Sequence, residues 1–253
     1  MQRIFGGPPD GDGAVTVTGQ DAYHLARVLR MREGDEVILS DPAGRDHLCR
    51  IEAAAPDAVR LRAVGSRENP GEPPYRAVLY QGMPKGDKPE TVVQKAVELG
   101  AAEIVFVVTE RAISRPDEKT AEKKRERYAR VAEAAAKQCG RGSVPGVRFL
   151  PSFAAALAEA AGTFSLFCYE GGGTAPLSAL LPACPPEERV SLFIGPEGGF
   201  SDAEAGAAAA ANCRFCGLGP RILRTETAGA HALSCLSFAW ERGAEGPARP
   251  FSS

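Results

Sequence analysis

From residue 76 onward, short apolar segments alternate with helical segments, and this alternation constrains the fold more than any other feature. The expected strands are 76–81, 103–108, 164–168, 190–194 and 215–218, and the expected helices are 90–99, 118–139, 153–161, 203–212 and 228–241. Strands that are apolar on both faces and separated by helices are typical of βα units around a buried parallel sheet. We therefore expect an α/β fold for this part of the chain.

A proline-rich segment, 68–74, separates this region from a different N-terminal pattern. Three prolines and a glycine in seven residues cannot continue a helix or a central strand, so we expect a linker here. The strand-like segments before it are 14–18, 36–40, 47–53 and 58–64. A helical segment, 21–31, places Leu25, Val28 and Leu29 on one face. Several short strands and one helix predict a small β-barrel.

The charge is unevenly distributed along the chain. The net charge is −2, yet residues 111–148 contain eleven Lys or Arg and five acidic residues. Such a segment is either a phosphate-binding face or a solvated helix with i,i+4 ion pairs, and charge alone does not separate the two. No apolar run approaches the roughly 18–20 residues of a membrane-spanning helix, and the N-terminus does not resemble a secretory signal. We therefore expect a cytoplasmic protein without a membrane partner.

The seven cysteines are scattered and odd in number, which argues against a disulfide framework. Cys213 and Cys216 form one C-x-x-C, but a tetrahedral zinc site needs four ligands and no second close pair is present. Structural thiols are therefore favoured over a metal or redox site. The histidines lie far apart in the sequence, so we expect no metal.

Glycine-rich loops follow three of the expected strands, at 169–173, 195–200 and 219–227. Parallel α/β sheets bind ligands beyond the carboxyl ends of their strands, and glycine lets a ligand approach the main chain. The three loops together predict a binding pocket. The phosphate-binding loop, the dinucleotide fingerprint and the nucleophile elbow of serine hydrolases are all missing from the sequence.

Two C-terminal motifs, IGPEGGF at 194–200 and LGPRILRTETA at 218–228, make the chain resemble the RsmE family of 16S ribosomal RNA (uracil-N3) methyltransferases, in the SPOUT superfamily. Further motifs that fit this family lie at 3–5, 24–30, 85–88, 94–100 and 133–141. The resemblance implies a PUA-like RNA-binding β-barrel at 1–70 and a SPOUT methyltransferase domain with a C-terminal trefoil knot at 75–243. It also implies S-adenosyl-L-methionine (SAM) as cofactor, a homodimer through the knot, and the small ribosomal subunit with its 16S rRNA as substrate.

The resemblance assigns roles to particular residues. The expected cofactor-binding residues are Tyr169, Glu170, Ile194, Gly195, Pro196, Glu197, Gly198, Gly199, Leu218, Gly219, Ile222, Leu223, Arg224, Thr225 and Thr227. The expected catalytic residues are Arg141 and Glu226. The expected RNA-binding residues are Arg3, Arg27, Arg30, Lys85, Lys88 and Arg141. Thr225, Glu226 and Thr227 are expected on a loop that closes the pocket.

Several assignments have alternatives at this stage. Arg141 either contacts the target uridine or satisfies carbonyls at a helix end. Glu197 is expected to cap the following turn rather than act chemically, and Arg224 either pairs with Glu226 or reaches RNA. Arg27 and Arg30, on one helical face, either bind RNA or are merely exposed. The competing functions are a non-catalytic RNA-binding protein, a related enzyme acting on transfer RNA, and an unrelated nucleotide-using α/β enzyme.

Overall fold

The computed structural model describes residues 1–183, 189–241 and 251, so the predicted domain end at 243 lies outside the described part. The chain divides into two compact units. The first comprises Met1–Glu72, Ala136–Val144 and the described residue Phe251, and the second comprises Pro73–Ala135 together with the described residues from Pro145 to Glu241. No described helix combines the length and the apolar character that crossing a membrane requires.

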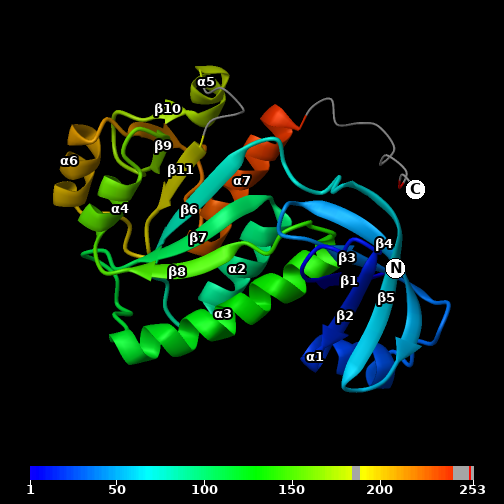
Figure 1. The fold of residues 1–253 in the computed structure, drawn as a ribbon. Helices are drawn as coiled ribbons and strands as arrows, with labels where there is room; N and C mark the ends of the chain where they lie inside the picture. Colours follow the sequence, from blue (N-terminus) through cyan, green and yellow to red (C-terminus); the bar gives the residue numbers. More distant parts are fainter. Residues whose placement is uncertain (184–188, 242–250, 252–253) are drawn as a thin grey trace. The chain divides into compact units, whose positions relative to one another are not determined.

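The first unit is built on a curled five-stranded sheet (Figure 1). Its strands are β1 (Gln2–Phe5), β2 (Ala14–Thr18), β3 (Glu36–Ser40), β4 (Arg45–Ala54) and β5 (Ala58–Glu68), in the order β1-β3-β4-β5-β2. β1 runs parallel to β3, and the other pairs are antiparallel. Two register shifts between β4 and β5, where bulges bend a strand, accompany the curl. The strand β1 was not predicted from the sequence.

The predicted helix at 21–31 is helical only as far as Val28, and its type changes after Tyr23. An α-helical turn, α1 (Gly19–Tyr23), passes into a π-helical turn, η1 (His24–Val28). A π turn takes up more residues per turn than an α turn, so side chains spaced for an α-helix do not stay on one face. Leu25 is fully buried, whereas Val28 and Leu29 are 57% and 43% exposed, contrary to the shared face expected for the three.

The second unit contains a seven-stranded sheet in which every pair is parallel, which confirms the expected parallel sheet. Its strands are β6 (Arg76–Gly82), β7 (Ala101–Val107), β8 (Gly146–Leu150), β9 (Phe164–Cys168), β10 (Ala175–Pro176), β11 (Arg189–Ile194) and β12 (Arg214–Gly217), in the order β10-β12-β9-β11-β6-β7-β8. Its helices are α2 (Lys88–Glu98), α3 (Glu118–Cys139, ending in the first unit), α4 (Phe153–Glu159), α5 (Leu177–Leu180), the 3-10 turn η2 (Leu181–Ala183), α6 (Asp202–Ala210) and α7 (Thr225–Trp240).

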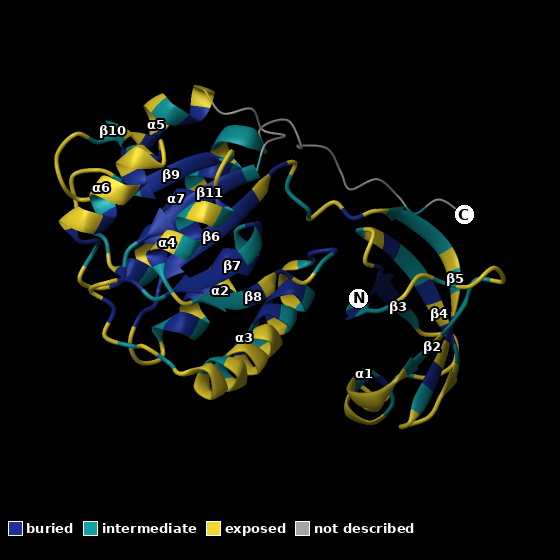
Figure 2. Cartoon of the chain, turned by 60° about the vertical axis from the view of Figure 1, so that its left-hand side comes forward, coloured by how far each residue is buried: buried dark blue, intermediate teal, exposed yellow. Residues whose placement is uncertain are grey.

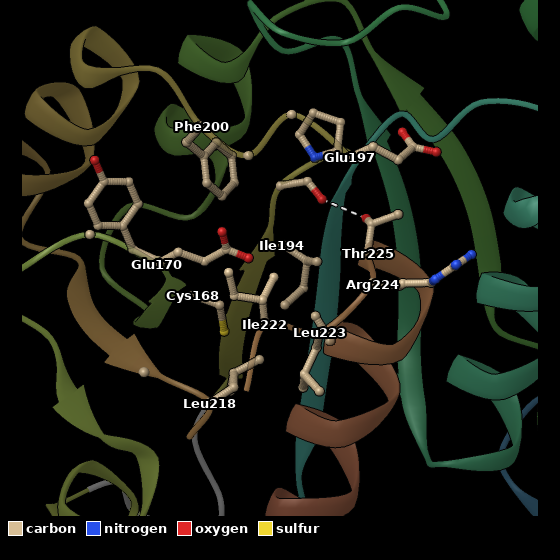
Figure 3. Close-up of a pocket in the computed structure, with 18 of the residues that line it drawn as sticks. Cys168, Glu170, Ile194, Glu197, Phe200, Leu218, Ile222, Leu223, Arg224 and Thr225 are labelled. Carbon is tan, nitrogen blue, oxygen red and sulfur yellow. Dashed lines mark hydrogen bonds between the residues drawn. The ribbon is translucent and has the colours of Figure 1, made fainter. Parts of the chain in front are cut away.

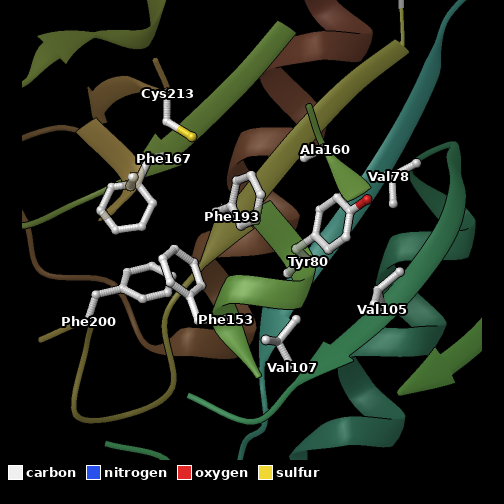
Figure 4. Packing of buried hydrophobic residues seen from close by; sticks show 12 residues of the cluster. Val78, Tyr80, Val105, Val107, Phe153, Ala160, Phe167, Phe193, Phe200 and Cys213 are labelled. Atoms are coloured by element: carbon white, nitrogen blue, oxygen red, sulfur yellow. The ribbon is translucent and has the colours of Figure 1, made fainter. Parts of the chain in front are cut away.

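Helices cover both faces of this sheet. Helices α4 and α6 pack on one face, and α2 and α7 pack together on the other (Figures 1 and 2). Alternate residues of the central strand β6 serve the two faces: Val78 and Tyr80 enter an aromatic cluster beneath α4 with Phe153 and Phe193 (Figure 4). Burial of these large rings is the main stabilising contribution on that face.

Candidate active site

A large cavity, about 990 Å³ in volume, lies where strands β9, β11 and β12 end. The three glycine-rich loops predicted to form a pocket line it together. The lining residues are Lys85, Lys88, Arg111, Cys168–Gly171, Thr174, Ile194–Phe200, Cys216–Thr225 and Ala228. The carboxyl ends of adjacent parallel strands meet at one edge of the sheet, which is why loops far apart in the sequence converge here.

The loop after β11 is so tightly folded that a side chain would not fit at Gly195. A Cβ atom on Gly195 would lie 3.0 Å from the Cα of Gly199, and Gly199 itself has φ +65°. A Cβ atom on Gly82, at the end of β6, would lie 2.6 Å from the backbone nitrogen of Pro196. The glycines therefore let main chain approach main chain, and backbone forms part of the cavity wall here.

Gln81 and Thr225 fasten this loop to helix α7. The Nε2 of Gln81 donates to the carbonyl of Gly195 at 3.2 Å and to Oγ1 of Thr225 at 2.7 Å. Oγ1 of Thr225 donates to the same carbonyl at 2.6 Å, the bond drawn in Figure 3. Gln81 is fully buried, and Thr225 is 6% exposed. Contrary to the prediction of a closing loop, Thr225, Glu226 and Thr227 form the first turn of α7.

Apolar side chains gather along one part of the cavity. Ile194, Leu218, Ile222 and Leu223 lie close together in Figure 3, and the Glu170 carboxylate lies at their margin. Ile222 is 82% exposed, although it is aliphatic. An apolar surface flanked by backbone polar groups and a carboxylate suits a ligand with a flat aromatic part and a polar, cationic part. The lining therefore fits the expected SAM.

Charged side chains form the other part of the cavity. Nζ of Lys88 lies 2.9 Å from Oε1 of Glu197 and 3.5 Å from Oε2 of Glu226, and Glu197 also accepts from the backbone nitrogen of Lys85 at 3.2 Å. Burial acts to raise the pKa of Glu197, but the hydrogen bonds from Lys88 and the backbone outweigh it and hold this pKa below its usual value. Glu197 therefore accepts a hydrogen bond from a backbone N–H group, as a capping residue does, and also pairs with the ammonium group of Lys88.

Most of the expected cofactor-binding residues line the cavity. Those that do are Tyr169, Glu170, Ile194, Gly195, Pro196, Glu197, Gly198, Gly199, Leu218, Gly219, Ile222, Leu223, Arg224 and Thr225. Thr227 does not; it is exposed on the first turn of α7. Glu226 does not line the cavity either, but its carboxylate reaches Lys88, which does. Lys88, rather than Arg224, is the ion-pair partner of Glu226 among the described residues.

Sequence reasoning missed several lining residues. They are Arg111, Cys168, Gly171, Thr174, Phe200, Cys216, Gly217, Pro220, Arg221 and Ala228. Gly171, Phe200, Pro220 and Arg221 lie within the three predicted loops but were not assigned to the cofactor. The others, except Arg111, lie next to a loop, so extending each loop by one to three residues would have included them. Arg111 has no such signal, because it follows β7 and lies among other basic residues in the sequence.

Arg3, expected to bind RNA, has a structural role instead. Its side chain is 8% exposed, and its guanidinium pairs with the buried carboxylate of Asp46, with Nη2 of Arg3 donating to Oδ2 at 3.0 Å. Nδ2 of Asn69 donates to both oxygens of Asp46 at 3.0 Å. Burial acts to raise the pKa of Asp46, but the bonds from Arg3 and Asn69 outweigh it and lower the pKa. A charge fully engaged in this way is unavailable to a phosphate.

The structure separates the other expected RNA-binding arginines. Arg27 lies in η1 and Arg30 lies beyond it with φ +55°, so the two do not share a helical face as predicted, although both are exposed. The side chain of Arg141 is 4% exposed, and its Nε and Nη2 lie 2.8 and 2.9 Å from the carboxylate of Glu72. A contact between Arg141 and the target uridine stays a prediction, and this ion pair would have to open for it.

The C-x-x-C cysteines do not face one another. Cys216 instead lies opposite Cys168 on the neighbouring strand, with 3.2 Å between the sulfur atoms, and both line the cavity. The hydrogen bond between them and burial raise the pKa of Cys168. Cys213 is buried in the aromatic cluster, and Cys184 lies outside the described residues. Within the described part of the chain, no three His, Cys, Asp or Glu side chains gather as metal ligands would.

Comparisons with known proteins agree with this geometry. Residues 71–237 match the RNA methyltransferase domain family, and residues 17–64 match the RNA methyltransferase PUA domain family. The ribosomal RNA small subunit methyltransferase E of Bacillus subtilis is 35% identical over 231 residues, which cover 89% of this chain and 90% of that protein. The protein of the same name from Mycobacterium tuberculosis is 30% identical over 244 residues, or 93% and 92% of the two chains.

Solved structures lead to the same family. The ribosomal RNA small subunit methyltransferase E of Neisseria gonorrhoeae, bound to SAM, superposes with a TM-score of 0.84 at 28% identity, covering 95% of this chain and 98% of that one. A Legionella pneumophila protein with bound SAM gives 0.82 at 31% identity, covering 94% and 97%. These matches confirm the predicted family and its fold, a PUA domain followed by a parallel-sheet SPOUT domain. The chain thus belongs to the RNA methyltransferase family that includes the ribosomal RNA small subunit methyltransferases E.

Proposed function

We propose that this protein transfers a methyl group from SAM to N3 of one uridine of 16S ribosomal RNA, in the assembled small subunit. The observation that carries the proposal is the cavity at the ends of β9, β11 and β12, in which the backbone-built, partly apolar pocket adjoins a cluster of charged side chains. The relatives named as small subunit methyltransferases match across both units, and two solved relatives hold SAM. Because the proposed substrate is the small ribosomal subunit, we place the reaction in the cytoplasm.

The two parts of the cavity have different roles in the proposed reaction. SAM supplies an already activated methyl group, so the enzyme mainly has to position donor and acceptor. The loop after β11 and the start of α7, fastened by Gln81 and Thr225, keep the pocket rigid. Uracil N3 lies on the Watson–Crick edge, so the target base enters the cavity unpaired or flipped out of its stack.

Glu226 is the proposed base that takes the N3 proton. Its Oε2 atom is buried without a hydrogen-bond partner among the described residues, and it is held 3.5 Å from Nζ of Lys88. Glu226 does not line the cavity, so the N3 proton would reach its carboxylate through a bridging water. The side chain of Lys88 positions Glu226 and Glu197 on one ammonium, so the two carboxylates stay together despite their like charge.

RNA binding completes the proposal. Lys85 and Lys88 lie at the cavity, where they would meet the target nucleotide, and the exposed Arg27 and Arg30 of the first unit would contact the RNA backbone. The C-terminal region forms a trefoil knot, and two copies of the chain pair through it. These assignments rest on the family resemblance.

The test is methyl transfer from labelled SAM to small subunits that lack their native modification, followed by identification of the labelled base. N3-methyluridine at one site supports the proposal, and Glu226→Gln should bind SAM normally but transfer the methyl group about 100-fold more slowly. Transfer to transfer RNA instead, or SAM binding without transfer to any ribosomal RNA, would overturn the proposed substrate. An active Glu226→Gln enzyme would overturn only the proposed base.

A further inference from the structure

Arg111 is an arginine in the cavity to which neither the sequence motifs nor the proposed mechanism assigns a role. It lies after β7, and its Nη1 donates to the carbonyl of Gly198 at 3.2 Å. A Cβ atom on Gly198 would lie 3.2 Å from the Cβ of Arg111, so the absence of a side chain at Gly198 is what admits the arginine. The segment after β7 that carries Arg111 and the loop after β11 that carries Gly198 are therefore in direct contact.

The positive charge of Arg111 is not neutralised in the structure. Among the described residues no carboxylate forms an ion pair with Arg111. Lys88, which also lines the cavity, is by contrast paired with both Glu197 and Glu226. One donor of the guanidinium is used by a neutral carbonyl, and Nε and Nη2 have no protein partner within the described part of the chain. Arg111 therefore presents to the cavity an uncompensated cation in which two of the three nitrogens, Nε and Nη2, are unused as donors within the described part of the chain.

The segment that carries Arg111 is rigidly held. Arg115 donates to three of its carbonyls: Nε to Ala112 at 3.2 Å, and Nη2 to Thr109 at 3.1 Å and Glu110 at 2.6 Å. The backbone nitrogen of Glu110 in turn donates to Oε1 of Glu204 at 2.8 Å. These bonds hold the backbone of the segment, and the bond to Gly198 holds the exposed guanidinium itself. A donor held in place before the reaction stabilises developing charge at a smaller cost of reorganising the site.

We propose that Arg111 is a catalytic residue that donates to a carbonyl oxygen beside N3 of the target uracil. The inference rests on the proposed function. When N3 loses its proton to the base, negative charge spreads onto the two flanking carbonyl oxygens, and Arg111 stabilises it there. The electron pair of N3 then forms the bond to the methyl carbon, and the carbon–sulfur bond breaks with its electron pair returning to sulfur. A planar guanidinium suits such an oxygen better than a strongly hydrated ammonium.

The test compares Arg111→Ala with the wild type in single-turnover methyl transfer, at saturating RNA and SAM, across pH. The RNA is made with uridine or with 5-fluorouridine, whose fluorine makes the N3 proton more acidic. Arg76→Ala is the matched control, because Arg76 is an exposed arginine at the start of β6, at the opposite edge of the sheet. Affinity for SAM, measured by calorimetry, reports on the integrity of the pocket.

Arg111→Ala should react about 100- to 1,000-fold more slowly at neutral pH, the range seen when one such donor is removed, with unchanged SAM affinity. The deficit should shrink as pH rises and on the 5-fluorouridine RNA, because both ease loss of the proton. A phosphate contact would instead raise the KM for RNA and leave the saturated rate intact, and a purely structural role would give a deficit independent of pH and fluorine. Either result would overturn the inference. Failure of the wild type to methylate uridine would be a failure of the proposed function instead.

Discussion

The buried cluster around Asp46 and the charged part of the cavity use the same chemical groups in opposite ways. Asp46 is fully buried, and arginine and amide donors occupy its oxygens. At the cavity, Glu197 and Lys88 each keep 23% of their side chains exposed, and Arg111 has no carboxylate partner among the described residues. The comparison shows that the residue type does not decide the role of a charge. A charge that is buried and paired maintains the fold, and a charge that is exposed or lacks an oppositely charged partner is available to a ligand.

The largest expected effect on stability comes from removing the carboxylate of Asp46 from the buried cluster. Asp46→Ala leaves Arg3 buried without its partner, and removing one member of a buried ion pair typically costs about 3–5 kcal/mol. The free energy of unfolding, from urea denaturation, should fall by this amount. Because Asp46 lies in the first unit and the SAM pocket in the second, SAM affinity should be preserved below the unfolding transition.

The control for Asp46→Ala is Glu52→Ala, which breaks the solvent-exposed pair between Glu52 and Arg62 on the same sheet. Exposed ion pairs contribute little to stability, so its effect should be far smaller. If the two variants destabilised the protein equally, burial would not distinguish the cluster from an ordinary surface pair.

SAM affinity should be more sensitive to a backbone change in the cavity than to the loss of the Arg111 charge, which is expected to leave it unchanged. A Cβ atom added by Gly195→Ala would press against the backbone of Gly199 at 3.0 Å, so the loop after β11 must shift. SAM affinity should fall at least about tenfold, equal to about 1.4 kcal/mol. Gly206→Ala is the control, since Gly206 lies in α6 with open space around its Cα, and alanine there should stabilise the helix by up to about 1 kcal/mol. Unchanged SAM affinity in Gly195→Ala would show that the loop does not form the cofactor wall.

The contrast between the two regions also explains what the sequence predicts well. Five strands of the parallel sheet, α2, α3, α4, α6 and the three glycine loops follow from local patterns of apolar residues and turn residues, and the structure has them close to their expected positions, whereas β8 and β10 were not predicted. The capping box at Ser201 and Glu204, predicted from the Ser-x-x-Glu spacing, is present in full. Such features depend on residues near one another in the chain.

What the sequence could not predict depends on partners distant in the chain. Arg3 pairs with Asp46 across 43 positions, and Arg141 with Glu72 across 69, so neither arginine reveals locally that its charge is engaged. Arg111 was counted only as one of many basic residues, because the carbonyl it contacts belongs to Gly198 on another loop. The π turn η1 was missed since propensities do not distinguish it from an α turn.

Lowering the pH should reduce the free energy of unfolding by a smaller amount, and this reduction should come from the buried cluster around Asp46. The pKa of Asp46 in the folded protein is held below its ordinary value of 3.8, so its ionised form stabilises the fold above that pH. This stability is lost as pH falls from about 3.8 through the lowered folded pKa. The free energy of unfolding should decline over that window in the wild type, and the decline should be weaker in Asp46→Asn. The same decline in both proteins would place the sensitive carboxylate elsewhere.

The smallest expected effect concerns the cap of α6, which serves both stability and the cavity. Ser201→Ala removes the hydrogen bond that the backbone nitrogen of Glu204 donates to Ser201 Oγ, and loss of such a cap costs about 1 kcal/mol. Oε1 of Glu204 can still accept from the backbone nitrogen of Glu110, so methyl transfer should stay near the wild-type rate. Glu204→Ala removes that support from the Arg111 segment as well and should slow transfer. Equal rates in the two variants would show that the segment does not need Glu204, and that Arg115 alone fixes Arg111.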